Sequence, residues 1–132
     1  MMSYYLAIDM GASSGRHILG SIEDGKIKLE EIYRFENGIS KIGDEYCWDI
    51  QGLFNEIKKG IKKCKEIGKV PKTIGIDTWA VDFVLLDEND EMLGNAVAYR
   101  DDRTEGYMEK AFQVIPQDML YLYTGIQFQR FN

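Results

Sequence analysis

The stretch Asp9-Met10-Gly11-Ala12-Ser13-Ser14-Gly15-Arg16 joins two apolar segments of strand length. Tyr4–Ile8 precedes it and His17–Ile22 follows it. A link this rich in glycine and serine between two strands predicts a tight hairpin with a small backbone profile. Its two glycines, Gly11 and Gly15, allow a positive φ and a close approach of a ligand.

The same hairpin carries groups that suit a phosphate site. Its serines and bare backbone N–H groups can receive phosphate oxygens, and Arg16 adds a fixed positive charge. Asp9, at the end of the first strand, can hold Mg²⁺ through water, because this ion keeps several waters and takes few carboxylates. An ordinary hairpin with small turn residues is the alternative. A P-loop and a dinucleotide fingerprint are excluded, because no Gly-Lys-Ser/Thr follows and the next segment is strand-like.

Composition narrows the class of protein. The 132 residues have the length of one domain, and an apolar content of 45% is enough for a core. The net charge of −6 argues against a nucleic-acid-binding surface, because such surfaces are basic. Cys47 and Cys64 have no metal-ligand spacing, and with His17 as the single histidine a zinc site has few ligands. Without a signal-peptide pattern or a long apolar run, we expect a soluble, cytoplasmic protein.

The first half of the chain predicts a three-stranded antiparallel meander followed by a parallel crossover. Ile27–Phe35 alternates with period two, apart from a break at Glu31 and Ile32, and forms the third strand. Asp49 is the expected N-cap of an amphipathic helix of about five turns that stops at Gly68. Its expected apolar face consists of Ile50, Leu53, Phe54, Ile57, Ile61 and Cys64. Thr73–Thr78 then predicts a fourth strand, which should lie parallel to the first and beside it.

The remaining segments give weaker signals. The connection from Ile39 to Trp48 has no clear period. Val81–Asp87 predicts a further strand or a continuation of the fourth, and residues 92–99 an extended return segment. Thr104 is the expected cap of a second helix, and a short third helix should begin at Pro116 and end at Gly125. The fold class is therefore α/β, with a mixed sheet flanked by helices.

Two carboxylates beside apolar strand residues suggest a second site. Asp77 ends an otherwise apolar strand that we expect to be central, and Asp82 interrupts Val81 and Phe83. Such carboxylates are costly unless they are solvated, paired or close to a metal. The pair Trp79-Ala80 lies between them, at the strand end where ligands gather in open α/β sheets. An Asp-rich turn with a core tryptophan is the alternative.

A charged run further along the chain could join this site. Arg100-Asp101-Asp102-Arg103 follows the expected return segment. Most runs of this kind are surface ion pairs or helix caps. In a cleft, Arg100 and Asp101 would instead hydrogen-bond sugar hydroxyls.

Four stretches carry a resemblance to a known family. The sequence resembles the N-terminal part of the rhamnulokinases, which are FGGY carbohydrate kinases within the actin, sugar-kinase and Hsp70 ATPase superfamily. The similarity runs over almost the whole chain, and the Trp79 and Tyr99 segments distinguish this group from glycerol and xylulose kinases. The stretches are Ala7–Arg16, Gly75–Asp87, Ala98–Thr104 and Gly125–Asn132.

The resemblance implies a ribonuclease-H-like fold and a sugar kinase. ATP and Mg²⁺ would be the cofactors, and L-rhamnulose would be phosphorylated at its 1-hydroxyl. Residues Ala12 to Arg16 would form the ATP phosphate loop, while Trp79 and Ala80 would line the sugar pocket. Ala80 stands where these kinases commonly have glycine, so its methyl group bears on which sugar is accepted.

Whole kinases of this family are several times longer than this chain. The resemblance therefore implies that residues 1–132 are the first part of the N-terminal domain. The catalytic base and the C-terminal, adenine-holding domain would follow Asn132, and the tail Gly125–Asn132 leads on as if into further structure. The alternatives are another FGGY kinase for a ketose or polyol, and a non-catalytic nucleotide-binding domain of the same superfamily. We expect no nucleic-acid or membrane partner.

Overall fold

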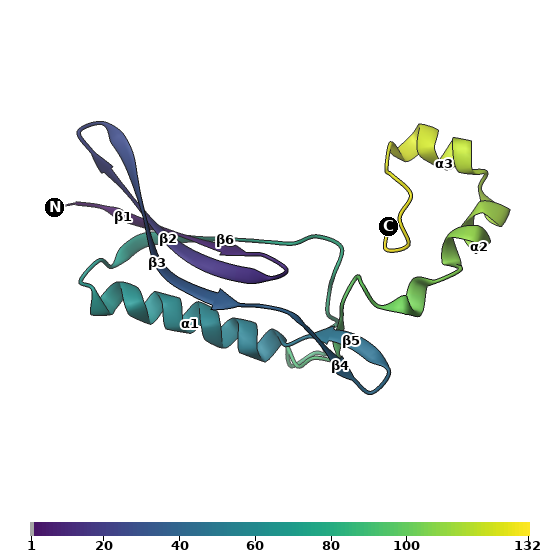
Figure 1. Cartoon of the computed structure of the whole chain (residues 1–132), viewed down its shortest axis with the longest axis horizontal. Coiled ribbons are helices and arrows are strands. Elements are labelled where there is room, and N and C mark those ends of the chain that lie inside the picture. Colours follow the sequence, from purple (N-terminus) through teal and green to yellow (C-terminus); the bar gives the residue numbers. More distant parts are fainter. Residues whose placement is uncertain (1) are drawn as a thin grey trace. The chain divides into compact units, whose positions relative to one another are not determined.

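A computed structural model of the chain describes residues 2–132 (Figure 1). These residues form two compact units. The first consists of residues 2–39 and 49–80, and the second of residues 40–48 and 81–132. The chain enters each unit twice, so both are built from segments that are far apart in the sequence.

A four-stranded mixed sheet forms the first unit, in the order β3-β2-β1-β6. β1 (Tyr4–Met10), β2 (Ser14–Glu23) and β3 (Lys26–Glu36) form an antiparallel meander. β6 (Pro71–Thr78) follows a helix and pairs with β1 in parallel. This confirms the predicted ribonuclease-H-like arrangement of a meander and a parallel crossover. One detail of the prediction is wrong, because β6 lies at an edge of this sheet and not at its centre.

A β-bulge explains the break in the alternation of the third strand. His17 pairs with Tyr33, but the next residue, Ile18, pairs with Glu31. Ile32 is therefore left without a partner on β2, and its side chain packs against the core. One extra residue in a strand shifts the side-chain alternation by one position.

Both ends of α1 (Ile50–Glu66) form as predicted. The Asp49 carboxylate accepts a hydrogen bond from the Gly52 N–H at 2.8 Å, which satisfies one donor of the first turn. At the other end Gly68 has a φ of 72°, and its N–H donates to the Lys65 carbonyl oxygen at 3.1 Å. A glycine in the left-handed region just beyond the last helical residue is a common way to end a helix.

The core of the first unit lies between α1 and one face of the sheet (Figure 1). The apolar stripe of α1 that contacts this core is narrower than predicted. Phe54 is wrongly placed on it, because its side chain is 54% exposed and carries the Lys58 ammonium 4.7 Å from its ring centre. The buried members of the core are Leu6, Ile8, Leu19 and Cys64.

His17 brings α1 close to the sheet. Its imidazole is fully buried on β2 and lies edge-on to the Tyr33 ring, with 5.5 Å between ring centroids. A Cβ atom added at Gly60 of α1 would lie 2.2 Å from this imidazole. The helix can therefore approach β2 this closely only because residue 60 has no side chain.

The second unit contains a short three-stranded sheet in the order β4-β5-β7. Its strands are β4 (Ile39–Ile42), β5 (Glu45–Trp48) and β7 (Ala96–Val97). The connection with no clear period is thus a hairpin, which turns at Gly43 with a φ of 60°. Strands of four residues are too short for alternation to be recognised against the background of the sequence.

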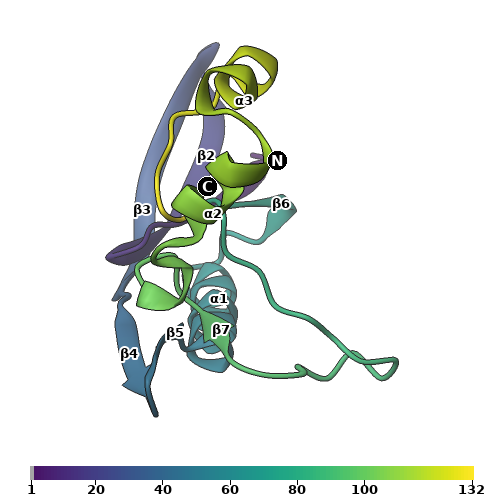
Figure 2. The same cartoon turned by 90° about the vertical axis from the view of Figure 1, so that its right-hand side faces the viewer.

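The strand expected at Val81–Asp87 is not formed. Figure 2 shows a long loop between β6 and β7, and its only ladder-like feature in the described chain is a bridge between Leu86 and Met92. A turn follows Leu86, in which the Asp87 carboxylate accepts the N–H groups of Asn89 and Glu91. Of the expected extended segment 92–99, only β7 is strand.

The second helix begins later than predicted. Thr104 does not cap it, since this residue ends the 3₁₀ turn η1 (Asp102–Thr104). α2 (Tyr107–Val114) is preceded by Gly106, whose φ of 74° turns the chain into the helix. A positive φ at that point suits glycine far better than threonine.

The third helix agrees with the prediction. α3 (Gln117–Thr124) follows Pro116 and ends at Gly125, which has a φ of 62°. Its bounds therefore come from a proline, whose φ is fixed, and from a glycine, which can adopt a positive φ. None of the helices in residues 2–132 is long and apolar enough to cross a membrane.

We expect the stability of the chain to fall as the pH drops below about 6.5, because of His17. Burial lowers the pKa of His17 below its ordinary value of 6.5, while the Ile57 backbone and the Glu56 carboxylate act in the opposite direction. Neither ring nitrogen has a hydrogen-bond partner among residues 2–132. The unfolded chain therefore takes up the proton first, and the free energy of unfolding should decrease by up to about 1.4 kcal/mol per pH unit.

Urea unfolding between about pH 5 and 7 measures this slope. His17→Phe and His17→Leu remove the titrating group, so either variant should flatten the pH dependence relative to the unsubstituted chain. Carboxylates titrate in both proteins and cancel in the difference. An equal slope in variant and parent would contradict the role of His17.

Candidate functional site

The predicted hairpin between β1 and β2 is present, and it is closed by its own hydrogen bonds. The Gly11 N–H donates to the Ser14 carbonyl oxygen at 3.0 Å. Asn37, at the end of β3, donates through its side-chain amide to the Gly11 carbonyl oxygen at 2.9 Å and through its backbone N–H to the Ser13 carbonyl oxygen at 3.0 Å. Asn37 thus holds the loop in place from the end of the neighbouring strand β3.

These bonds reduce the set of backbone donors that remain for a phosphate. The Gly11 N–H is already used inside the hairpin. Within residues 2–132, the N–H groups of Ala12 and Ser13 have no hydrogen-bond partner. The loop therefore keeps two adjacent backbone donors, together with the serine hydroxyls, for an anion.

The glycines of the hairpin act differently from the expectation. Neither Gly11 nor Gly15 has a positive φ. A Cβ at Gly15 would lie 2.1 Å from the Phe35 ring, and one at Gly11 would lie 2.9 Å from the Ser14 carbonyl oxygen. Both glycines are required by contacts within the first unit, so close approach to a ligand is not needed to explain them.

A row of charged residues crosses the sheet next to the hairpin. Strand register places Arg34, Arg16, Asp9 and Asp77 opposite one another on β3, β2, β1 and β6. The Asp9 atom Oδ2 accepts from Arg16 Nε and lies 2.9 Å from Arg16 Nη2. Both side chains are nearly half exposed, so this pair adds little to stability. The Asp9–Arg16 ion pair instead fixes a position: it holds the Arg16 guanidinium beside the Asp9 carboxylate at the end of β1.

Asp77 lies beside Asp9 but is not a buried carboxylate. β6 is an edge strand, and the Asp77 side chain is exposed and accepts the N–H of Thr78 at 3.0 Å. The argument that burial makes Asp77 costly is therefore wrong for the described residues. No group of three or more potential metal ligands occurs among residues 2–132.

In the second unit, Asp82 is bound by Trp48, which is not one of the predicted sugar-site residues. Trp48 is 4% exposed at the end of β5, and its indole Nε1 donates to Asp82 Oδ2 at 2.6 Å. The residue before Asp82, Val81, has a φ of 71°. A β-branched residue in this region is a true backbone outlier. Beyond a tryptophan in an otherwise featureless connection, no sequence pattern indicates this contact.

Trp48 also contacts the segment that carries Arg100. Its ring centroid lies 6.5 Å from that of Tyr99. The Arg100 guanidinium lies 5.4 Å from the Tyr99 ring, and Arg100 Nε donates to the Tyr99 hydroxyl at 3.1 Å. Two of the predicted sugar-site residues, Asp82 and Arg100, are thus linked through aromatic side chains of one unit.

Asp101 has a structural task in the same unit. It is buried, and its carboxylate accepts the N–H of Tyr46 at 2.8 Å and that of Arg103 at 2.8 Å. These two backbone bonds, the one from Tyr46 above all, lower the pKa of Asp101. Its carboxylate therefore ties the turn after β7 to β5, and a contact with sugar stays a prediction.

The predicted sugar-site residues are divided between the two units. Trp79 and Ala80 end the first unit, whereas Asp82, Arg100 and Asp101 belong to the second. Trp79 is partly buried and Ala80 is exposed. That all five residues line one pocket stays a prediction.

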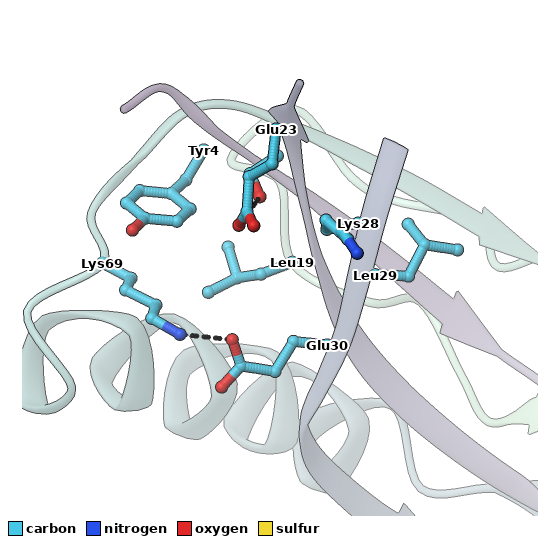
Figure 3. Close-up of a pocket in the computed structure, with 8 residues that line it drawn as sticks. Tyr4, Leu19, Glu23, Lys28, Leu29, Glu30 and Lys69 are labelled. Carbon is cyan, nitrogen blue, oxygen red and sulfur yellow. Dashed lines mark hydrogen bonds and ion pairs between the residues drawn. The ribbon is translucent and has the colours of Figure 1, made fainter. Parts of the chain in front are cut away.

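A pocket of about 270 Å³ lies at the other end of the sheet (Figure 3). It is bordered by Tyr4 at the start of β1, by Glu23 at the end of β2, and by an ion pair between Lys69 and Glu30. Ligands in open α/β sheets gather at the carboxyl ends of the parallel strands. This pocket is at the amino end of β1, so the hairpin end remains the candidate site.

The chain matches the N-terminal domain of the FGGY family of carbohydrate kinases over residues 4–132. It is 57% identical over 131 residues to a rhamnulokinase of Halalkalibacterium halodurans, covering 99% of this chain and 28% of that protein. A rhamnulokinase of Oceanobacillus iheyensis is 54% identical, with 100% of this chain and 28% of that protein covered. The chain therefore spans little more than a quarter of the length of these relatives.

Solved structures of sugar kinases have the same fold. The gluconate kinase of Lactobacillus acidophilus superposes with a TM-score of 0.76 at 16% identity, over 96% of this chain and 25% of that one. The Plasmodium falciparum glycerol kinase with ADP superposes with a TM-score of 0.67 at 19% identity, over 98% of this chain and 27% of that one. At these identities the likeness shows the fold alone.

We expect Gly15→Ala to lower the free energy of unfolding by about 1–3 kcal/mol, because the new methyl group would overlap the Phe35 ring. The companion substitution Phe35→Leu shortens the opposing side chain. In the Gly15→Ala/Phe35→Leu double variant, part of the loss should therefore be recovered. Urea unfolding of the single and double variants gives the coupling between the two sites.

Gly20→Ala is a matched control on the same strand. A Cβ at Gly20 would meet its nearest neighbour, a Leu29 methyl group, at the ordinary distance of 3.7 Å. This substitution should change the free energy of unfolding by less than about 0.5 kcal/mol. Equal effects of Gly15→Ala and Gly20→Ala would refute the packing role of Gly15.

Proposed function

Because the chain belongs to the FGGY family of carbohydrate kinases, we propose that it is the first part of a rhamnulokinase, which phosphorylates L-rhamnulose at its 1-hydroxyl with ATP. The observation that carries this proposal is identity of 57% and 54% to two rhamnulokinases over nearly the whole chain. We place the catalytic base and the C-terminal, adenine-holding domain after Asn132. Residues 1–132 are then the first part of the N-terminal domain.

The β1–β2 hairpin is the proposed ATP phosphate loop, from Ala12 to Arg16. Two adjacent N–H groups that have no partner among residues 2–132, at Ala12 and Ser13, suit the oxygens of a phosphate. Arg16 adds positive charge to a chain whose net charge is −6. Local charge of this kind is needed where an anionic ligand binds to an acidic protein.

Asp9 is the proposed contact to Mg²⁺, through water. Its Oδ2 is engaged by Arg16, which leaves Oδ1 available among the described residues. One remaining carboxylate oxygen fits an ion that keeps most of its waters. When bound, Mg²⁺ neutralises charge on the transferring phosphoryl group. Asp9 would then face the Mg²⁺ ion and Arg16 the phosphate, both at the hairpin end of the sheet.

The proposed sugar pocket uses an apolar surface and a few fixed polar groups. Trp79 and Ala80 would cover sugar carbons, and Asp82, Arg100 and Asp101 would select among hydroxyls. Ala80 supports the second candidate, another ketose or polyol as substrate, because its methyl group stands where related kinases commonly have glycine. A nucleotide-binding domain without chemistry is the third candidate.

Expression of the complete gene that encodes this chain tests the proposal. The purified product should form rhamnulose 1-phosphate from ATP and L-rhamnulose, with kcat/KM higher than for xylulose, gluconate and glycerol. Residues 1–132 alone should be inactive, because a base must lie within hydrogen-bond reach of the sugar hydroxyl. A preference for another sugar would favour the second candidate, and ATP binding without transfer to any sugar the third.

We expect Asp9→Asn in the complete enzyme to lower kcat by about 10²–10³ while the dissociation constant for the sugar is unchanged. Loss of the charge that faces the metal should also raise the Mg²⁺ concentration needed for half-maximal activity. Steady-state kinetics and calorimetric sugar binding measure these quantities. Glu31→Asn is the control, because this exposed carboxylate forms its ion pair with Arg34. A loss confined to sugar affinity would contradict the assignment of Asp9.

A further inference from the structure

We propose that Trp48 is a positioning residue for substrate specificity, and that it acts by holding the Asp82 carboxylate in place for a sugar hydroxyl. This inference rests on the proposed kinase function. It adds a residue that neither the family match nor the sequence pattern assigns. Its evidence is the set of contacts around one buried indole in the second unit.

The first step is the hydrogen bond itself. Trp48 Nε1 lies 2.6 Å from Asp82 Oδ2, and the indole is 4% exposed. A hydrogen bond from a neutral donor to a carboxylate is stronger than one between neutral groups. The short distance and the buried donor fix one oxygen of Asp82 in a defined position.

The second step is the rigidity of the donor. Trp48 ends β5, where it pairs with the buried Ala96 of β7, and the preceding pair, Cys47 with Val97, is buried as well. A side chain held by buried neighbours on a strand is a precise support for a functional group. Trp48 therefore connects the small sheet to a loop in which no helix or strand is assigned among the described residues.

The third step is the backbone next to Asp82. Val81 has a φ of 71°, which costs free energy for a β-branched residue. Such a conformation persists only where surrounding contacts hold it. The Trp48–Asp82 hydrogen bond is one contact of this kind, immediately after the strained residue.

The fourth step is the second contact of the same indole. Trp48 packs against Tyr99, and Tyr99 holds the Arg100 guanidinium through its ring and its hydroxyl. One indole thus links an acceptor, Asp82, with a donor, Arg100. A carboxylate and a guanidinium fixed together suit a polyhydroxylated ligand, whose hydroxyls both donate and accept.

The test removes the indole N–H and keeps an aromatic side chain at position 48. In the complete enzyme, Trp48→Phe should raise the KM for the sugar by about tenfold, since a charge-assisted hydrogen bond is lost. The KM for ATP should change less than about twofold, because ATP is placed at the hairpin of the first unit. Tyr46→Phe is the matched control on β5: its backbone N–H still binds Asp101, and the sugar KM should stay unchanged.

A double variant separates positioning from general support. If Trp48 acts through Asp82, then Trp48→Phe/Asp82→Ala should have the same sugar KM as Asp82→Ala alone. A Trp48 that is only structural would multiply the two effects, or would lower the melting temperature without changing the sugar KM. Either result would overturn the inference.

Trp48→Phe could also leave a gap in the sheet and fail to fold. Site-specific replacement by benzothienylalanine then serves as the second variant, because its sulfur replaces the N–H in a ring of the same shape. An unchanged sugar KM for this enzyme would equally overturn the inference. Absence of rhamnulose phosphorylation by the unsubstituted enzyme would instead refute the proposed function, so the two failures are distinguishable.

Discussion

The contact between His17 and Gly60 sets the distance between α1 and the sheet. A buried imidazole on β2 meets the helix at a position where even one methyl group would overlap it. Protein interiors are close-packed, so a change at such a point is transmitted to the neighbouring elements. Since α1 directly precedes β6 in the chain, the position of α1 on the sheet also limits where β6 can pair with β1.

The hairpin depends on the same principle of close contact. Gly15 accommodates the Phe35 ring, and Asn37 binds the loop carbonyl groups of Gly11 and Ser13. All of these contacts come from the end of β3, which lies two strands away from β1 in the sheet order. The shape of the proposed phosphate loop is thus imposed largely by the end of a strand that is not part of the hairpin.

The second unit contains hydrogen bonds to carboxylates that join segments far apart in the sequence. Its sheet is small, and much of its order comes from polar groups bound to buried partners. Asp101 accepts two backbone N–H groups, and Asp82 accepts the indole N–H of Trp48. The two backbone hydrogen bonds lower the pKa of Asp101, because hydrogen bonds to the ionised form favour it.

The amino-acid sequence by itself determined the elements with long periodic patterns or strong local signals. The meander, α1 with its Asp49 and Gly68 ends, β6 and the bounds of α3 follow from alternation, helical spacing and the backbone preferences of a few residues. The tertiary structure decided the rest: the short β4–β5 hairpin, the loop in place of a strand at residues 81–87, the exposure of Phe54 and the partner of Asp82. Trp48 and Asp82 are 34 residues apart. A contact over such a separation leaves no periodic trace, because it arises only when packing has brought the two segments together.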